Sequence, residues 1–425
     1  MRKKAEIVRI GRGGNFKNII KWFSPGLGIK RWIGFSVFGV VLAMIGSGYL
    51  SSDELYLFKI LDTVVALSGI IILILGIKRL MRAFISAFVS PAQQQELVDI
   101  LLQKRQLNKG PEVVAIGGGT GLATLLTGLK EYTSNITAIV TVADDGGSSG
   151  RLRQQFDILP PGDIRNCLVA LADAPVLMRD LFQFRFDRSS ELSGHSFGNL
   201  FITAMTRVTG DFEKAIKETS RVLALRGQVV PSTLSNVVLV AQHKDGSVTE
   251  GEEKIPKVRL PIQRVNFRSS SEVTATPEAL NAIKQAEIIV LGPGSLYTSI
   301  IPNLLIKEIT DAIVASDAIK VYVCNIMTQP GETDGFSASD HIKTLVAHSH
   351  PRIFDYVIVN SGAIPQWVLD RYAQEGSVPV KTDIREIRLM GYQVISEDIV
   401  VMENEVVRHD SLKLAQIIIG IEEGL

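Results

Sequence analysis

Two apolar stretches within the first eighty residues constrain this chain more than any other feature. Residues 33–50 contain no charged side chain, and residues 61–77 contain only Asp62. A helix that crosses the hydrocarbon core of a bilayer needs about 20 mainly apolar residues. Glycines such as Gly39 and Gly46 would weaken a helix in water but are common in membrane helices. The sequence therefore predicts two transmembrane helices, forming a hairpin over residues 33–80, with a single buried helical hairpin as the alternative.

The basic residues around these stretches predict how the hairpin is oriented. Nine lysines and arginines precede the first stretch and Lys78, Arg79 and Arg82 follow the second, whereas the short linker carries Asp53 and Glu54. The positive-inside rule places both ends of such a hairpin in the cytoplasm. We expect a multi-pass protein of the inner (cell) membrane, with a basic cytoplasmic N-terminus (residues 1–32), a connector (residues 81–110) and a cytoplasmic large domain (residues 111–425).

Composition limits what the large domain can do. The 425-residue chain has a formal net charge of +1, so it lacks the basic excess of a general nucleic-acid binder. Its two cysteines, Cys167 and Cys324, lie far apart in the sequence. We expect buried thiols there, not a disulfide or a zinc site.

The large domain alternates short Val/Ile-rich runs with helical patterns. The runs lie at residues 112–116, 136–142, 287–291, 319–324 and 354–359, with helical segments such as 122–131 and 213–223 between them. Continuous apolar runs are typical of parallel strands that are buried on both faces. A turn at Asp245-Gly246 predicts a hairpin. We therefore expect an α/β fold with a Rossmann-like, doubly wound, mostly parallel sheet and a small antiparallel insertion at about residues 229–270.

A glycine-rich loop follows the first predicted strand and precedes a helix. Glycines let the backbone approach a phosphate closely, and a helix N-terminus supplies free N–H groups. The G-x-G-x-G spacing differs from the dinucleotide fingerprint and lacks the lysine of a P-loop. We interpret the loop as a phosphate or nucleotide cradle, with a merely tight turn as the alternative. Its residues are Gly117, Gly118, Gly119, Thr120 and Gly121.

Two adjacent aspartates, Asp144 and Asp145, end the second predicted strand. Neighbouring side chains on a strand point to opposite sides, so one can face a ligand while the other anchors the loop. A carboxylate here could hold Mg²⁺ or accept ribose hydroxyls, or it could only cap the loop. The loop that follows adds candidate ligand contacts at Gly146, Gly147, Ser148 and Ser149.

Two further polar segments hold candidate ligand contacts on helices. Asp163 is expected to cap a helix whose first turn carries Arg165 and Asn166, which could reach a phosphate. His195 and Asn199 are four residues apart, so on a helix they would share a face. His195 is a candidate acid or base together with Asp144 and Asp145, and a structural histidine is the alternative.

A second glycine turn follows the third predicted strand. It contains Gly292, Gly294 and Ser295, and Asn325 follows the next strand. These residues would form a second phosphate contact or the far wall of the same cleft. The chain has no recognisable order of nucleophile and base, so hydrolase and protease functions have no support.

Taken in order, six motifs resemble one protein family. GGGTGL, TVADDGGSSGRLR, PPGDIRN, SGHSFGNL, GPGSLYTS and NIMTQPGETDGFSASDH are similar to the gluconeogenesis factor family. That family is related to 2-phospho-L-lactate transferase, which builds a deazaflavin coenzyme. The resemblance covers about residues 111–425, and the membrane hairpin is expected to be an addition that typical members lack.

The resemblance implies a ligand and a role. It implies binding of a UDP-sugar such as UDP-N-acetylglucosamine, and support of cell shape and wall synthesis during growth on gluconeogenic carbon sources. By motif match, Asp144 and Asp145 would be metal or ribose ligands, and Tyr372 and Arg408 would contact the UDP-sugar. Tyrosine can stack on uracil and arginine can bind a diphosphate, although both could also serve surface packing.

Three hypotheses about function remain at this stage. The first is a membrane-anchored nucleotide-sugar sensor, with cell-wall synthesis proteins as candidate partners and a homo-oligomer as a candidate state. The second is an Mg²⁺-dependent phosphotransferase resembling the related transferase. The loop after Asp145 is more polar than in that branch, so we expect no deazaflavin. The third is an NAD-dependent oxidoreductase, whose support is a glycine loop of the wrong spacing.

Overall fold

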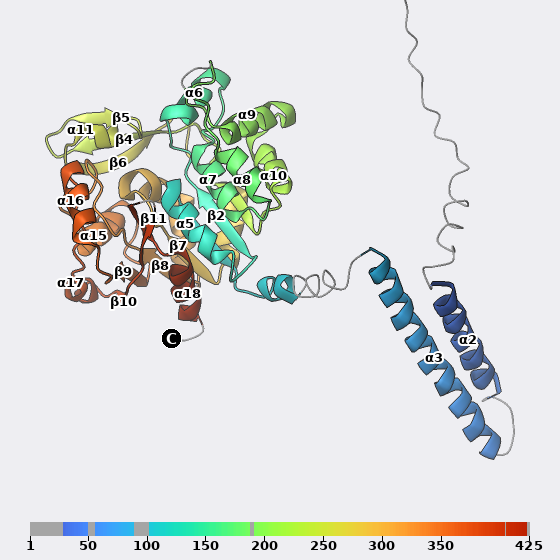
Figure 1. Cartoon of the computed structure of the whole chain (residues 1–425). Helices are drawn as coiled ribbons and strands as arrows, with labels where there is room; N and C mark the ends of the chain where they lie inside the picture. The colour runs from blue at the N-terminus through green and yellow to red at the C-terminus, as the bar shows by residue number, and fades with distance from the viewer. Residues whose placement is uncertain (1–28, 50–55, 89–101, 188–190, 404, 423–425) are drawn as a thin grey trace, which may run out of the picture. The chain divides into compact units, whose positions relative to one another are not determined.

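A computed structural model describes residues 29–49, 56–88, 102–187, 191–403 and 405–422 (Figure 1). Two compact units divide the chain at Gln103 and Lys104. Most of the basic N-terminus, the linker between the apolar stretches and residues 89–101 of the predicted connector lie outside the described residues.

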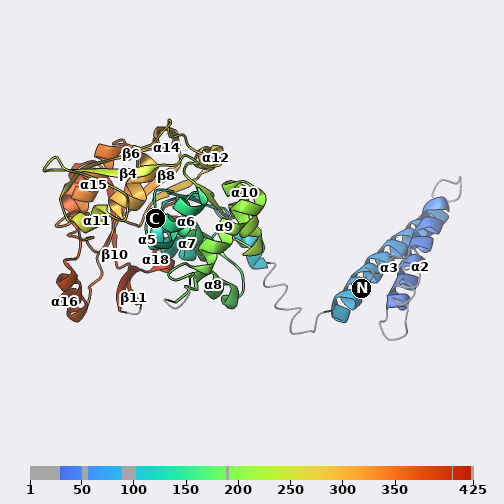
Figure 2. The same cartoon turned by 90° about the horizontal axis from the view of Figure 1, so that it is seen from above.

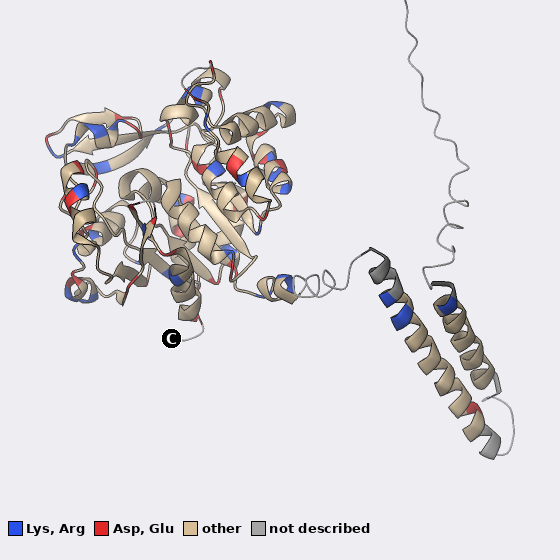
Figure 3. Cartoon of the chain, in the orientation of Figure 1, with Lys and Arg blue, Asp and Glu red and all other residues tan. Residues whose placement is uncertain are grey.

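The N-terminal unit contains two helices, α2 (Ile29–Tyr49) and α3 (Tyr56–Phe88), packed side by side. A Cβ on Gly39 would lie 2.8 Å from the carbonyl oxygen of Gly69, so small residues allow the two backbones to approach closely. Figure 3 shows few charged residues along both helices. The N-terminal unit is therefore a pair of closely packed apolar helices.

Within the described residues, one helix is long and apolar enough to cross a membrane. It covers Ile60–Arg82 of α3, and the described part of α2 forms a shorter apolar helix, Arg31–Ser47. The structure thus contains one helix of sufficient length and apolarity, and both transmembrane helices stay predictions. Helix α3 also extends beyond residue 80, where the hairpin was expected to end.

A seven-stranded parallel sheet forms the centre of the large unit, with the strand order β10-β9-β8-β7-β1-β2-β3. A three-stranded antiparallel sheet (β5-β4-β6) and a two-stranded one (β11-β12) are separate from it. The strands are β1 (Val113–Gly117), β2 (Ile136–Val140), β3 (Gln228–Pro231), β4 (Val238–His243), β5 (Val248–Glu250), β6 (Ile262–Arg268), β7 (Ile288–Leu291), β8 (Ile319–Val323), β9 (Tyr356–Asn360), β10 (Gln393–Glu397), β11 (Val400–Glu403) and β12 (Val406–His409).

Helices pack against the large sheet and around its edges (Figures 1 and 2). They are α5 (Gly119–Leu129), α6 (Gly147–Phe156), α7 (Gly162–Leu171), α8 (Val176–Gln183), α9 (Phe197–Thr209), α10 (Phe212–Val222), α11 (Ile255–Val258), α12 (Pro277–Gln285), the π-helix η1 (Leu296–Ile300), α13 (Ile301–Leu304), α14 (Lys307–Ala315), α15 (Ala338–His348), α16 (Gln366–Glu375), α17 (Ile384–Leu389) and α18 (Ser411–Glu422).

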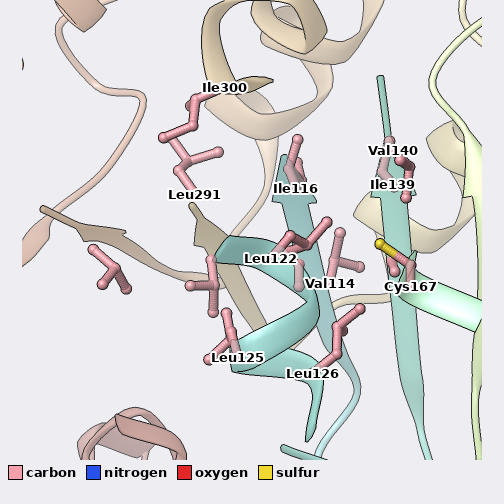
Figure 4. Packing of buried hydrophobic residues seen from close by; sticks show 14 of the residues in the cluster. Val114, Ile116, Leu122, Leu125, Leu126, Ile139, Val140, Cys167, Leu291 and Ile300 are labelled. Carbon is pink, nitrogen blue, oxygen red and sulfur yellow. The ribbon is translucent and has the colours of Figure 1, made fainter. Parts of the chain in front are cut away.

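The core lies between the large sheet and its helices. Every residue of β1 and β2 is buried, as expected for strands covered on both faces. Leu122, Leu125 and Leu126 of α5 pack over β1, which presents Val114 and Ile116 toward the helix (Figure 4). This packing fixes the N-terminus of α5 at the carboxyl end of β1.

The expected Rossmann-like α/β fold is confirmed, with one correction to its boundaries. All five predicted strands are present in the parallel sheet. The insertion was expected to begin near residue 229, but β3 pairs in parallel with β2. The antiparallel sheet therefore begins at Val238, and its β4-β5 hairpin turns at Gly246, whose φ is +86°. Strand β10 and the β11-β12 hairpin were not predicted.

The strand order places a crevice at the middle of the sheet. Strand β1 pairs with β2 on one side and with β7 on the other. The chain first adds β2 and β3 on one side of β1. It later adds β7, β8, β9 and β10 on the other side. Open α/β sheets bind ligands at such a switch point, beyond the carboxyl ends of the strands. The loops after β1 and β7, which are the two glycine-rich loops, meet there.

Candidate functional site

A polar cleft of about 440 Å³ lies at this switch point. It is formed by the loops after β1, β2, β7 and β8, a loop of the antiparallel insertion, helix α16 and strand β12. Its lining residues are Gly118, Gly119, Thr120, Gly121, Asp144, Asp163, Glu252, Pro293, Gly294, Ser295, Ser299, Asn325, Ile326, Met327, Gln329, Tyr372, Val407, Arg408 and His409.

The first glycine loop forms one wall of the cleft. Gly118 precedes α5, and Gly119 opens it with a φ of +65°, a conformation that favours glycine. A Cβ on Gly118 would lie 2.6 Å from Oδ2 of Asp163, so only glycine lets this carboxylate approach the loop. The Asp163 carboxyl accepts a hydrogen bond from the Gly119 N–H, and the remaining N–H groups of the first turn of α5 can bind an anion.

The second glycine loop forms the opposite wall. The side-chain amide of Asn325 donates to the carbonyl oxygen of Gly294 at 2.9 Å and accepts from the N–H of Gly294 at 3.4 Å. Buried Asn303 donates to the Gly117 carbonyl at 3.1 Å, which ties the helices after β7 to the end of β1. The two walls are therefore held by side-chain amides at a fixed separation.

Three carboxyl groups from distant segments line the cleft. Burial and the nearby Asp144 raise the pKa of Asp163 to about 7. Burial, followed by Asp144 and Asp163, raises the pKa of Glu252 to about 8. Burial also raises the pKa of Asp144, against the hydrogen bond from the Gly146 N–H. Since each charge disfavours its neighbours, the cleft holds protons near neutral pH.

The paired aspartates have separate roles. Asp144 lines the cleft, whereas Asp145 accepts a hydrogen bond from the Glu253 N–H at 2.9 Å. A Cβ on Gly251, whose φ is +104°, would collide with the Asp145 carboxylate. Asp145 thus holds the segment after β5, and this contact places Glu252 in the cleft.

Tyr372 and Arg408 meet at the rim of the cleft. Tyr372 lies on α16, and its hydroxyl accepts a hydrogen bond from the Val407 N–H at 3.0 Å. Arg408 lies on β12, with Nη1 at 3.5 Å from Oγ1 of Thr120. Helix α16 therefore fixes the strand that brings a guanidinium group to the first glycine loop.

The candidate histidine lies in a buried polar network behind the cleft. Ser148 Oγ is 3.0 Å from Nδ1 of His195 and accepts a hydrogen bond from Asn199 Nδ2 at 3.1 Å. Arg165 donates to Asn199 Oδ1 at 3.1 Å and to Asn166 Oδ1 at 2.7 Å. Burial, with Arg151 nearby, lowers the pKa of His195. These contacts join α6, α7 and α9. They therefore give His195 a structural role.

Of the residues that the sequence singled out, the cleft brings together about half. Those that line it are Gly118, Gly119, Thr120, Gly121, Asp144, Gly294, Ser295, Asn325, Tyr372 and Arg408. Those that do not are Gly117, Asp145, Gly146, Gly147, Ser148, Ser149, Arg165, Asn166, His195, Asn199 and Gly292. Sequence reasoning missed Glu252 and expected Asp163 to be the N-cap of α7, a position that Pro161 occupies. The PPGDIRN motif contained a signal for Asp163, and no local pattern marks Glu252.

The side chains of the cleft can be compared with those that bind metal ions in proteins. In the described part of the chain, no group of three His, Cys, Asp or Glu side chains has the geometry of a metal site. Magnesium is commonly held by one or two carboxylates together with substrate phosphates. Asp144 and Asp163 both line the cleft and fit that mode, whereas Asp145 is engaged by the insertion.

The fold and cleft define a Rossmann-like α/β protein with its polar site at the switch point between β1 and β7. Residues 113–400 match the family model described as 2-phospho-L-lactate transferase CofD. The chain is 48% identical over 315 residues to the gluconeogenesis factor of Bacillus subtilis, with 74% of this chain and 99% of that protein covered. A crystal structure of a Bacillus halodurans protein matches with a TM-score of 0.71 and 47% identity, covering 73% of this chain and 99% of that one.

The chain belongs to the gluconeogenesis factor family, as the six motifs suggested. A relative from Nostoc is 47% identical over 419 residues and covers 94% of this chain and 91% of its own length. That match leaves room for few unmatched residues at the N-terminus. The Nostoc match thus extends into the N-terminal region, whereas the Bacillus subtilis relative matches 74% of this chain over nearly its whole length, as expected of members that lack the hairpin.

Proposed function

We propose that the cleft binds a UDP-sugar, with UDP-N-acetylglucosamine as the first candidate. The observation that supports this most directly is the meeting of Arg408 with Thr120 at the N-terminus of α5. A diphosphate would lie against the free N–H groups of α5 and the Arg408 guanidinium. Tyr372 would then stack on the uracil ring, and carboxyls such as Glu252 would bind sugar hydroxyls.

In this proposal the protein is a sensor anchored at the inner membrane, with its large unit in the cytoplasm. It would support cell shape and wall synthesis during gluconeogenic growth, with cell-wall synthesis proteins as partners and a homo-oligomer as one state. Anchoring would raise the local concentration of the sensor near membrane-bound partners. The apolar helix Ile60–Arg82 and the basic residues that flank it support the anchoring.

Calorimetric titration of the full-length protein in detergent micelles tests the ligand. We expect saturable binding of UDP-N-acetylglucosamine, with and without Mg²⁺, and none of NAD. Arg408→Ala should weaken binding about tenfold or more, because it removes a charge-assisted contact to the diphosphate. Absence of binding at millimolar ligand would contradict the proposal.

A second candidate is an Mg²⁺-dependent phosphotransferase, favoured by the family model that matches residues 113–400. Asp144 and Asp163 would hold the metal together with the phosphates of a nucleotide-activated acid. Turnover separates the two functions. A sensor leaves the UDP-sugar intact in an overnight incubation with Mg²⁺, whereas a transferase releases a nucleotide from an activated substrate.

A further inference from the structure

A second cavity opens beside the cleft, on the other side of Arg408. Its volume is about 560 Å³, and it shares only Thr120 and Arg408 with the cleft. It runs along α5 between that helix and the pair α7 and α8, with Glu403 of β11 at one edge. The proposed ligand of the cleft leaves this groove unexplained.

Two cations lie at the far end of the groove, Lys130 and Arg179. Lys130 is 7% exposed, and its ammonium donates to the Ala172 carbonyl at 3.0 Å. Burial, followed by the charge of Arg179, lowers the pKa of Lys130. Arg179 is half-buried, and two like charges that repel each other in such a place are unfavourable unless an anion lies nearby.

Carboxylates lie near this pair, because Asp180 and Glu403 line the groove and the charges of Glu131 and Asp173 act to raise the pKa of Lys130. The neighbouring Arg226 bonds to Asp173 at 2.9 Å and lies 3.7 Å from Glu131, so it uses the nearest carboxylates itself. Neither Lys130 nor Arg179 forms an ion pair with a described residue, and the buried Nε of Arg179 lacks any hydrogen-bond acceptor among them. This nitrogen is closed to solvent, and Arg179 contributes the rest of its half-buried side chain to the groove wall.

The rest of the groove is polar and suits a hydroxylated molecule. Thr124 and Thr127 donate their hydroxyl hydrogens to backbone carbonyls of α5, so their oxygens remain as acceptors. Asn166, Asp180 and Gln183 add amide and carboxylate groups, which pair well with ligand hydroxyls. The cations lie at one end of the groove and these polar groups lie along its walls. This distribution fits a ligand with one anionic group at one end and hydroxyls along the rest.

We propose that this groove is a second ligand site that takes a small hydroxylated molecule with a phosphate group, its phosphate bound by Lys130 and Arg179. The site is distinct from the nucleotide-sugar cleft and does not require that cleft to bind a UDP-sugar. Because Arg408 forms part of both walls, an occupant of the groove can influence the cleft through that one side chain.

Phosphate titration of the full-length protein in detergent micelles, at constant ionic strength, tests the proposal with inorganic phosphate as the probe. Arg179→Gln should weaken phosphate binding in the groove about tenfold, as expected for a lost charge-assisted contact. Thr124→Trp, which fills the groove from α5 without touching the cations, should weaken it similarly. Arg179→Lys should retain most of the binding because it keeps the charge.

Arg221→Gln is the matched control, since Arg221 lies on α10 with its side chain 66% exposed and paired with Glu218. It should leave the isotherm unchanged. Phosphate binding that is unaltered in both Arg179→Gln and Thr124→Trp would overturn the proposal and assign the anion to the glycine loop. Circular dichroism of each variant separates loss of the site from loss of the fold.

Discussion

Gly121 and Pro293 lie in such close contact that a Cβ on Gly121 would be 2.6 Å from the Pro293 carbonyl oxygen. This contact joins the two glycine loops across the middle of the sheet. Gly121 lies in the first turn of α5, where its φ is not in the left-handed region. Glycine is therefore required at position 121 because there is no room for a Cβ, and not because of the backbone conformation.

Gly121→Ala should consequently destabilise the protein. In an unobstructed helix the change would stabilise by about 1 kcal/mol, whereas overpacking costs about 1–3 kcal/mol. We expect a lower midpoint of thermal unfolding and weaker UDP-sugar binding, because the cleft walls must separate. Thr127→Ala, an exposed change in the same helix, is the control. A rise in the midpoint for Gly121→Ala would contradict the observed contact.

The acidic lining predicts that ligand affinity depends on pH. Glu252, with its pKa raised to about 8, is neutral at pH 6.5 and becomes charged as the pH rises through 8. A new negative charge near a diphosphate costs about 1 kcal/mol, so the affinity for UDP-N-acetylglucosamine without Mg²⁺ should fall about fivefold between pH 6.5 and 9. Calorimetry across this range measures the effect.

Glu252→Gln should make this decline shallower, because the amide stays neutral throughout, and the remaining decline comes from Asp163, whose pKa is about 7. Its neighbour provides a matched control. The hydrogen bond from Lys257 lowers the pKa of Glu253, which is therefore ionised over the whole range. Glu253→Gln should leave the pH profile as it is in the unmodified protein. A profile that is equally steep in Glu252→Gln would exclude this carboxyl as its source.

Because His195 has a structural role, its replacement should lower stability without changing ligand binding. His195→Ala leaves the buried Ser148 hydroxyl without its partner at 3.0 Å, and such a loss costs about 1 kcal/mol or more. We expect a lower free energy of unfolding in urea and an unchanged affinity for the UDP-sugar. An unchanged stability together with loss of binding or of turnover would instead place His195 in the chemistry.

The sequence predicted the parts of this site that are encoded locally. A strand followed by glycines and a helix specifies both the element and its position at the sheet edge, so Gly118–Gly121 and Gly294 could be placed in advance. Tyr372 and Arg408 followed from the family resemblance, because neither lies in a pattern with its own physical meaning.

Residues brought in by distant segments could not be predicted in this way. Glu252 reaches the cleft because Asp145 binds the chain beyond β5, a contact between residues 108 positions apart. Ser148 and His195 meet through the packing of α6 against α9, which converts a candidate site into a buried network. Asp144 and Asp145 lie in the loop after β2, so the direction in which each carboxylate points was likewise set by tertiary contacts.

Membrane attachment is a separate expectation. The full-length protein should sediment with the membrane fraction and resist an alkaline carbonate wash, because an apolar helix such as Ile60–Arg82 is held by the bilayer core. A variant that lacks residues 1–103 should remain in the supernatant. Release of the full-length protein by carbonate would contradict a spanning anchor and favour the buried helical hairpin.

The rim of the cleft allows a test that separates a ligand contact from general stability. Tyr372→Phe keeps the aromatic ring but removes the acceptor for the Val407 N–H. The β12 strand that carries Arg408 then loses a hydrogen bond worth about 1 kcal/mol, so the affinity for UDP-N-acetylglucosamine should fall about fivefold. Titration calorimetry, paired with thermal unfolding, measures both consequences.

Tyr392→Phe is a matched control, because the Tyr392 hydroxyl also bonds to the backbone, at the Pro351 carbonyl 2.9 Å away, and Tyr392 does not line the cleft. Both variants should lower the unfolding midpoint by a similar, small amount, since each loses one tyrosine–backbone hydrogen bond. Only Tyr372→Phe should weaken ligand binding. Equal losses of affinity in the two variants would show that stability alone is responsible, and equal retention would place the UDP-sugar away from α16 and β12.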